Sequence, residues 1–133
     1  GYDMHMNGNV ICRDFDVESG LALNSKSELK LENGFAAFTK DFFDNGAYVI
    51  ENNQTHEVSL RDPEGKNYLN VYFPEAPLFG LWSAEKKNAP YAAIGRCDKE
   101  DFNGSLEERE WGHALAQGAC FQAAYTIEIA GED

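Results

Sequence analysis

Apolar and polar residues alternate with a period of two in several segments of this 133-residue chain, and no other feature limits its fold as strongly. The clearest case runs from Phe121 to Ile129. Successive side chains of a β-strand point to opposite faces of a sheet, whereas a helix repeats every 3.6 residues. The segment is therefore predicted to be a strand that buries the face carrying Tyr125, Ile127 and Ile129.

Two further alternating segments are joined by a turn sequence and predict a β-hairpin. Residues 57–62 and 67–73 alternate, and Asp62-Pro63-Glu64-Gly65 connects them. Asp, Pro and Gly favour tight turns because they fit the backbone angles that a chain reversal requires. Large side chains on both sides of 67–73 predict a central strand, and residues 47–51 form another short β-rich run.

Helical signals are weak by comparison. Thr39 is a suitable cap for a turn through Phe43, and residues 106–111 form either a helical turn or a charged loop. The chain shows no internal repeat and no linker, so we expect one domain over residues 1–133, with residues 1–8 frayed. Many short strands separated by Gly, Asn and Pro predict an all-β fold, an antiparallel β-sandwich.

Charge excludes some classes of partner. The chain has 11 Lys and Arg residues against 23 Asp and Glu residues, a net charge of −12. Such a field repels phosphate backbones and anionic lipids, so we expect neither nucleic acid nor a membrane as partner. The 43% of apolar residues is too high for a disordered acidic tail. No signal-peptide pattern is visible at the start of the sequence, and we expect a cytoplasmic protein.

The residues that usually bind metals or carry catalysis are scattered. Cys12, Cys97 and Cys120 form no CxxC pair and no zinc pattern, so they are predicted to be reduced thiols, and we expect no metal and no cofactor. No two histidines stand in an HxH or HxxxH pair. The acidic run at 107–110 is typical of a solvated turn rather than of the separated carboxylates of a glycosidase. These residues leave open whether the protein is an enzyme.

An ordered series of motifs resembles a known family over residues 38–129. The series comprises FTKDFFDNGAYVI at 38–50, VSL at 58–60, VYFP at 71–74, PLFGLWS at 77–83, APY at 89–91, GRCD at 95–98, DF at 101–102, LEEREW at 106–111 and YTIEI at 125–129. In this order and spacing the motifs resemble the C-terminal half of the aldose 1-epimerase (galactose mutarotase-like) family. The resemblance is closest to its bacterial branch related to the lactose-operon epimerase-like proteins.

That resemblance implies a fold and a chemistry. The fold would be half of the large mutarotase supersandwich, with an open concave sheet that binds a hexose. The family reaction opens and recloses the sugar ring at the anomeric carbon. A carboxylate removes the proton of the anomeric hydroxyl and a histidine protonates the ring oxygen, without a metal or an organic cofactor.

Three departures from the family pattern predict weak or absent catalysis. The chain is about half the usual length, and the missing half normally supplies the acid histidine and an orienting arginine. The Glu-Pro-Trp segment that bears the basic glutamate is absent between Ile94 and Gly95, and Gly46 stands where many relatives have Asp. We therefore expect a carbohydrate-binding relative. Two alternatives are a structural or interaction module, and a piece of an epimerase that is active only with its other half.

Four residues are the predicted sugar site. Trp82 and Tyr91 can stack on the apolar faces of a sugar, and Arg96 and Asp98 can hydrogen-bond its hydroxyl groups. Trp82 could instead belong to the core, and Arg96 with Asp98 could be a structural ion pair. Half of a sandwich also leaves sheet edges uncovered, so we predict a two-fold homodimer.

Overall fold

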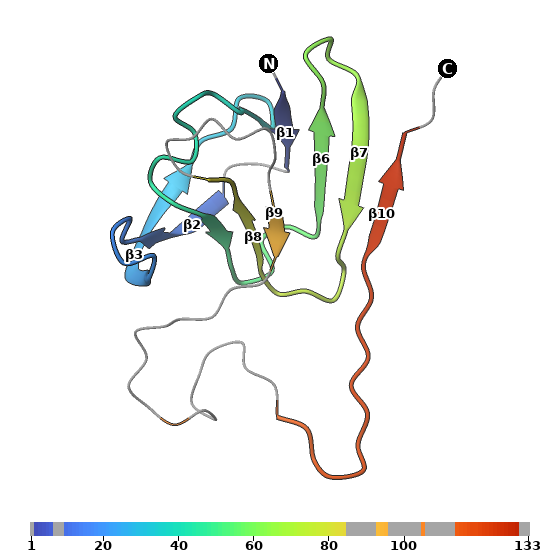
Figure 1. Ribbon diagram of the computed structural model, residues 1–133. Helices are drawn as coiled ribbons and strands as arrows, with labels where there is room; N and C mark the ends of the chain where they lie inside the picture. Colours follow the sequence, from blue (N-terminus) through green and yellow to red (C-terminus); the bar gives the residue numbers. More distant parts are fainter. Residues whose placement is uncertain (1, 7–9, 85–92, 96–104, 106–113, 131–133) are drawn as a thin grey trace.

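Ten β-strands form two antiparallel sheets of five strands each in the computed structural model, which describes residues 2–6, 10–84, 93–95, 105 and 114–130 (Figure 1). These residues contain no helix. The two sheets share one hydrophobic core, so the predicted all-β antiparallel sandwich is confirmed.

The first sheet has the order β10-β7-β6-β1-β4. Its strands are β1 (Asp3–His5), β4 (Phe35–Ala37), β6 (Glu57–Arg61), β7 (Asn67–Tyr72) and β10 (Thr126–Ile129). The second sheet has the order β3-β2-β5-β8-β9. Its strands are β2 (Val10–Phe15), β3 (Ala22–Leu29), β5 (Tyr48–Ile50), β8 (Phe79–Trp82) and β9 (Ala93–Gly95).

Alternate residues of both sheets build the core. The first sheet contributes Met4, Val58 and Val71, and the second contributes Ile50 and Leu81 among others. Met4, Val58 and Leu81 are completely buried. Their burial follows from the period-two pattern, because every second side chain of a strand faces the same side of its sheet.

The predicted hairpin is present as β6 and β7. The Gly65 N–H donates to the Asp62 carbonyl and the Asp62 N–H donates to the Lys66 carbonyl, each over 2.9 Å. The Asp62 carboxylate also accepts hydrogen bonds from the backbone N–H groups of Glu64 and Lys66. Gly65 has a positive φ of 83°, which glycine adopts without a steric penalty. Because β7 lies between β6 and β10, the prediction of an interior strand is also confirmed.

The start of the chain differs from the prediction. Residues 1–8 were expected to be frayed, but Asp3–His5 form a strand that pairs with both β4 and β6. Met4 is completely buried and Met6 is 1% exposed. A three-residue strand is too short to show a periodic pattern, and its two partner strands lie far along the sequence.

The last strand also differs. It covers Thr126–Ile129 rather than residues 121–129, and the face expected to be buried is exposed: Ile127 by 54%, Ile129 by 77% and Tyr125 by 71%. The register places Ile127 opposite Val71, on the core side of the sheet. However, β10 is the outermost strand, where the second sheet does not extend (Figure 1). Its apolar pattern is therefore real, but nothing in the described part of the second sheet covers it.

Candidate functional site

Trp82 lies at the end of β8 with 40% of its surface exposed. Its neighbour Leu81 is completely buried in the core. Successive side chains of a strand face opposite sides, so Trp82 faces away from the core. Of the two readings of Trp82, the structure favours a surface aromatic group over a core residue.

The other three predicted site residues, Tyr91, Arg96 and Asp98, lie outside the described residues. The backbone nevertheless relates the two segments of the predicted site. β9 pairs with β8, so that Ala93 is the partner of Trp82. The strand that ends with Trp82 and the strand that leads toward Arg96 are therefore neighbours in one sheet, which the sequence alone did not establish.

A charged cluster in the same sheet joins the buried residues Arg13 and Glu51 to the exposed Lys26. Arg13 donates from Nε and Nη2 to the Glu51 carboxylate over 2.5 and 2.8 Å, and from Nη1 to the Leu23 carbonyl over 2.9 Å. Lys26 Nζ lies 3.6 Å from Glu51 Oε2. Burial alone would raise the pKa of Glu51, but the hydrogen bonds and charge of Arg13, aided by Lys26, hold that pKa below its usual value.

This cluster stabilises the fold and offers little to a ligand. Arg13 is 5% exposed and Glu51 is 6% exposed, and their polar atoms are directed at each other. No local sequence motif marks this cluster. One signal was available: Arg13 interrupts an apolar segment, and a buried arginine requires a carboxylate partner.

The outer face of the first sheet carries a row of polar residues. His5, Ser59, Asn70 and Glu128 are direct cross-strand neighbours in that order. The Ser59 hydroxyl donates to Asn70 Oδ1 over 2.6 Å, and Asn70 Nδ2 donates to Glu128 Oε1 over 2.7 Å. Asn67 Nδ2 also donates to Asn70 Oδ1 over 2.9 Å. Because these groups satisfy one another, Asn70 serves mainly to join β6, β7 and β10.

A second group on this face surrounds His5. The imidazole packs against the Phe35 ring, with 4.7 Å between the ring centroids. The Arg61 guanidinium carbon lies 3.7 Å from the Phe35 centroid, and Arg61 donates two hydrogen bonds to Asp3. The arginine is thus fixed between a carboxylate and an aromatic ring.

Neither of the two described histidines, His5 and His56, is part of an acid–base pair with a described carboxylate. His56 Nδ1 lies 3.1 Å from the Phe73 carbonyl oxygen, and His5 contacts an aromatic ring. Within the described ranges, no histidine hydrogen-bonds a carboxylate, and no three His, Cys, Asp or Glu side chains gather as metal ligands would. His113 and the 107–110 run lie outside those ranges.

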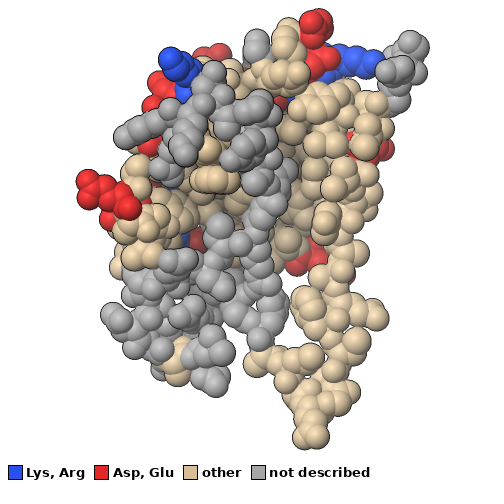
Figure 2. Space-filling model, in the orientation of Figure 1, with Lys and Arg blue, Asp and Glu red and all other residues tan. Residues whose placement is uncertain are grey.

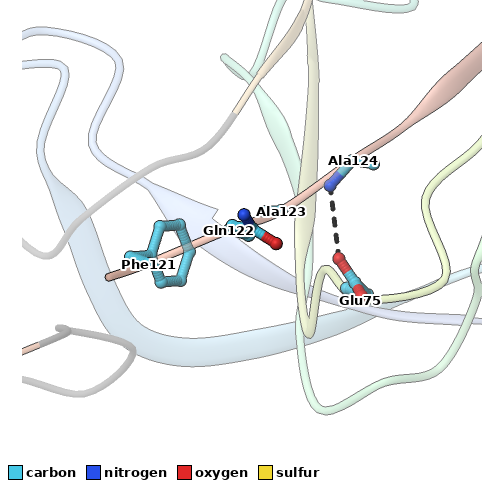
Figure 3. A pocket seen from close by; sticks show the side chains of 5 residues that line it. All are labelled: Glu75, Phe121, Gln122, Ala123 and Ala124. Atoms are coloured by element: carbon cyan, nitrogen blue, oxygen red, sulfur yellow. Dashed lines mark hydrogen bonds between the residues drawn. The ribbon is translucent and has the colours of Figure 1, made fainter. Parts of the chain in front are cut away.

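An open pocket lies where the chain approaches β10 (Figure 3). It is lined by Glu75 and residues 121–124, and the Ala124 N–H donates to Glu75 Oε2 over 3.2 Å. Glu75 and Gln122 contribute its two polar side chains beside the exposed Phe121 ring, and the hydrogen bond holds this segment against the loop that follows β7.

The surface electrostatics agree with the sequence. Figure 2 shows acidic side chains spread over the visible face, with few Lys or Arg side chains between them.

No helix in the described ranges is long and apolar enough to cross a membrane.

Comparison with known proteins identifies the fold. No protein-family model and no curated protein matches the chain. A solved structure of a galactose mutarotase related enzyme from Lactobacillus acidophilus matches with a TM-score of 0.78 and 27% identity, covering 98% of this chain and 44% of that one. A galactose mutarotase-like protein from Lactobacillus casei matches with a TM-score of 0.76 and 20% identity, covering 97% and 46%.

The chain is thus an antiparallel β-sandwich protein with one core between two five-stranded sheets. Its fold is the galactose mutarotase-like fold, and it spans slightly less than half the length of the two solved structures that it matches. The family resemblance seen in the motifs is confirmed at the level of the fold.

Proposed function

We propose that this protein binds a hexose and that its sugar site lies at the end of β8, around the exposed Trp82 and next to the paired strand β9. The site would also use Tyr91, Arg96 and Asp98. An exposed indole ring offers the flat apolar surface on which a pyranose stacks, and Arg and Asp offer planar hydrogen-bonding groups for its hydroxyls. The observation that carries the proposal is the 40% exposure of Trp82 within a galactose mutarotase-related fold.

We further propose that the isolated chain has little mutarotase activity and acts in the cytoplasm. The solved mutarotase-related structures are more than twice as long as the part that this chain covers. No residue of this sequence takes the place of the basic glutamate between Ile94 and Gly95. The free thiols of Cys12 and Cys120 are compatible with a reducing compartment.

Titration with α-galactose and α-glucose by NMR and calorimetry tests the binding proposal. Saturable shifts in backbone amides near β8 and β9 are expected. Polarimetry in the same buffer should give mutarotation rates close to those of buffer alone. Chemical shifts unaffected by any hexose would favour the alternative, a structural or interaction module, and a rate far above buffer would overturn the proposed lack of catalysis.

Paired variants locate the site. Trp82→Ala should weaken hexose binding by roughly tenfold, the loss expected when a stacking platform is removed. Tyr72→Ala, on the outer face of the other sheet, removes an aromatic ring of similar size and should leave affinity unchanged. The reverse pattern would place the sugar on the first sheet.

A further inference from the structure

Four strands form the edges of the two sheets, and three of them are protected against pairing with another chain. β4 and β9 are only three residues long, and β3 carries the exposed charged residues Lys26 and Glu28. Short length and charge are the usual means by which sheets avoid edge-to-edge association. β10 is one residue longer than β4 and β9 and carries a single charged residue, Glu128, but it exposes two large apolar side chains, Ile127 and Ile129.

The backbone of β10 presents free hydrogen-bonding groups at that edge. The Ala130 N–H donates to the Tyr68 carbonyl over 3.0 Å, so Ala130 faces β7. Backbone groups of successive residues in a strand point to alternate sides, which also directs Glu128 and Thr126 toward β7. The N–H and C=O groups of Tyr125, Ile127 and Ile129 therefore point away from the sheet.

The side chains of the same three residues lie on one face. Ile127 and Ile129 register opposite Val71 and Leu69, on the core side of the first sheet. An incoming strand would thus meet free backbone groups and an uncovered apolar face together. Pairing there would extend the sheet and bury both isoleucines.

We propose that β10 pairs antiparallel with β10 of a second copy of this chain, with Ile127 on the two-fold axis. In this register Ile127 meets Ile127 of the other copy, Tyr125 meets Ile129, and Thr126 meets Glu128. Apolar groups oppose apolar groups on the core side, and no two carboxylates are direct neighbours. A register centred on Glu128 would instead place two glutamates opposite each other in a chain that already carries a charge of −12.

This self-complementary pairing is why a second copy is the chosen occupant. An isologous interface needs one surface patch that fits itself under a two-fold rotation. A strand of alternating Thr-Ile-Glu-Ile satisfies that requirement when Ile127 lies on the axis. Each copy contributes the outer edge of its first sheet, so that the two first sheets form one continuous sheet.

Disulfide trapping tests the register. In a Cys97→Ser/Cys120→Ser background, Ile127→Cys would place two Cα atoms roughly 5.5 Å apart across the axis, within disulfide range. Mild oxidation should therefore give a covalent dimer. Thr126→Cys is the matched control, since Thr126 faces Glu128 of the other copy and its own counterpart lies beyond about 7 Å. Equal cross-linking of the two variants, or trapping of Thr126→Cys alone, would overturn the proposal.

Light scattering after size-exclusion chromatography tests the association itself. The unsubstituted protein should be dimeric at micromolar concentration, and Ile127→Lys should be monomeric with an unchanged circular dichroism spectrum, because Ile127 is already 54% exposed within one copy. Ile11→Lys, at a 44% exposed isoleucine in the second sheet, should remain dimeric. A monomeric unsubstituted protein, or a dimer unaffected by Ile127→Lys, would refute this interface, whatever the outcome of the hexose titrations.

Discussion

Arg13 on β2 donates two hydrogen bonds to the carboxylate of Glu51, which follows β5, over 2.5 and 2.8 Å. The side chains are 4% and 8% exposed. Two charges removed from water are tolerated only while each satisfies the other. This pair therefore makes the alignment of β2 with β5 sensitive to the loss of either partner.

Replacing Arg13 by Met should destabilise the protein by about 3–5 kcal/mol, because it leaves the Glu51 carboxylate buried without its main partner. The double variant Arg13→Met/Glu51→Leu should recover much of that loss, since no unpaired charge remains. Urea unfolding monitored by tryptophan fluorescence measures both. A double variant as unstable as Arg13→Met alone would show that packing, rather than the unpaired charge, causes the loss.

The same pair predicts how stability depends on pH. The pKa of Glu51 is lower in the folded protein than its ordinary value of 4.5, so the unfolded chain binds that proton first as the pH falls. Its contribution is complete above the ordinary value and is lost as the pH falls through the folded pKa. Unfolding free energies measured between about pH 7 and pH 3 should fall less steeply for Glu51→Gln than for the unsubstituted protein. Parallel curves would contradict this assignment.

Thiol reactivity should differ sharply between two cysteines. Burial, with a smaller effect of Asp14, raises the pKa of Cys12 to about 12, whereas Cys120 is exposed. The thiolate is the reactive form, so a pulse of iodoacetamide at about pH 8 should label Cys120 and leave Cys12 unmodified. Peptide mass spectrometry measures the extent at each site, and labelling in concentrated guanidinium provides the control in which both react. Rapid labelling of Cys12 in the folded protein would contradict its buried position.

The fold could be predicted where local pattern and turn chemistry agreed. The hairpin of β6 and β7 followed from alternation on both sides of Asp62-Pro63-Glu64-Gly65. β1 could not be predicted, because three residues show too little alternation. Its pairing with β6, which places Asp3 opposite Arg61, also joins segments far apart in the sequence. The expected burial of Ile127 failed for another reason: alternation identifies an apolar face, but only the tertiary arrangement decides what covers it.

The candidate site was predictable in part. Residue type and motif singled out Trp82, and the structure adds that it faces outward beside β9. The Arg13–Glu51 pair was missed, because its partners are 38 residues apart and no local spacing relates them. Long-range pairing of this kind depends on strand order, which a single sequence does not contain.

Gly34, which directly precedes β4 and lies against the end of β1, offers the sharpest test of local packing. Gly34 has a φ of +85°, and an added Cβ would lie 2.6 Å from His5 Nε2 and 2.7 Å from the Met6 carbonyl oxygen. Gly65 has a similar φ of +83°, but nothing lies within 4 Å of its added Cβ. Gly65→Ala therefore measures the backbone strain alone, roughly 1–2 kcal/mol.

Gly34→Ala should lower the free energy of unfolding by roughly 2–5 kcal/mol, because the backbone strain is joined by a clash that the Met6 carbonyl cannot avoid without moving β1. Urea unfolding of the two variants gives the difference directly. Adding His5→Ala to Gly34→Ala removes only one of the two clashes, so we expect partial recovery. Full recovery would mean that the imidazole is the sole obstacle and that the Met6 backbone yields easily, whereas equal losses for Gly34→Ala and Gly65→Ala would mean that β1 is not held as tightly as its burial indicates.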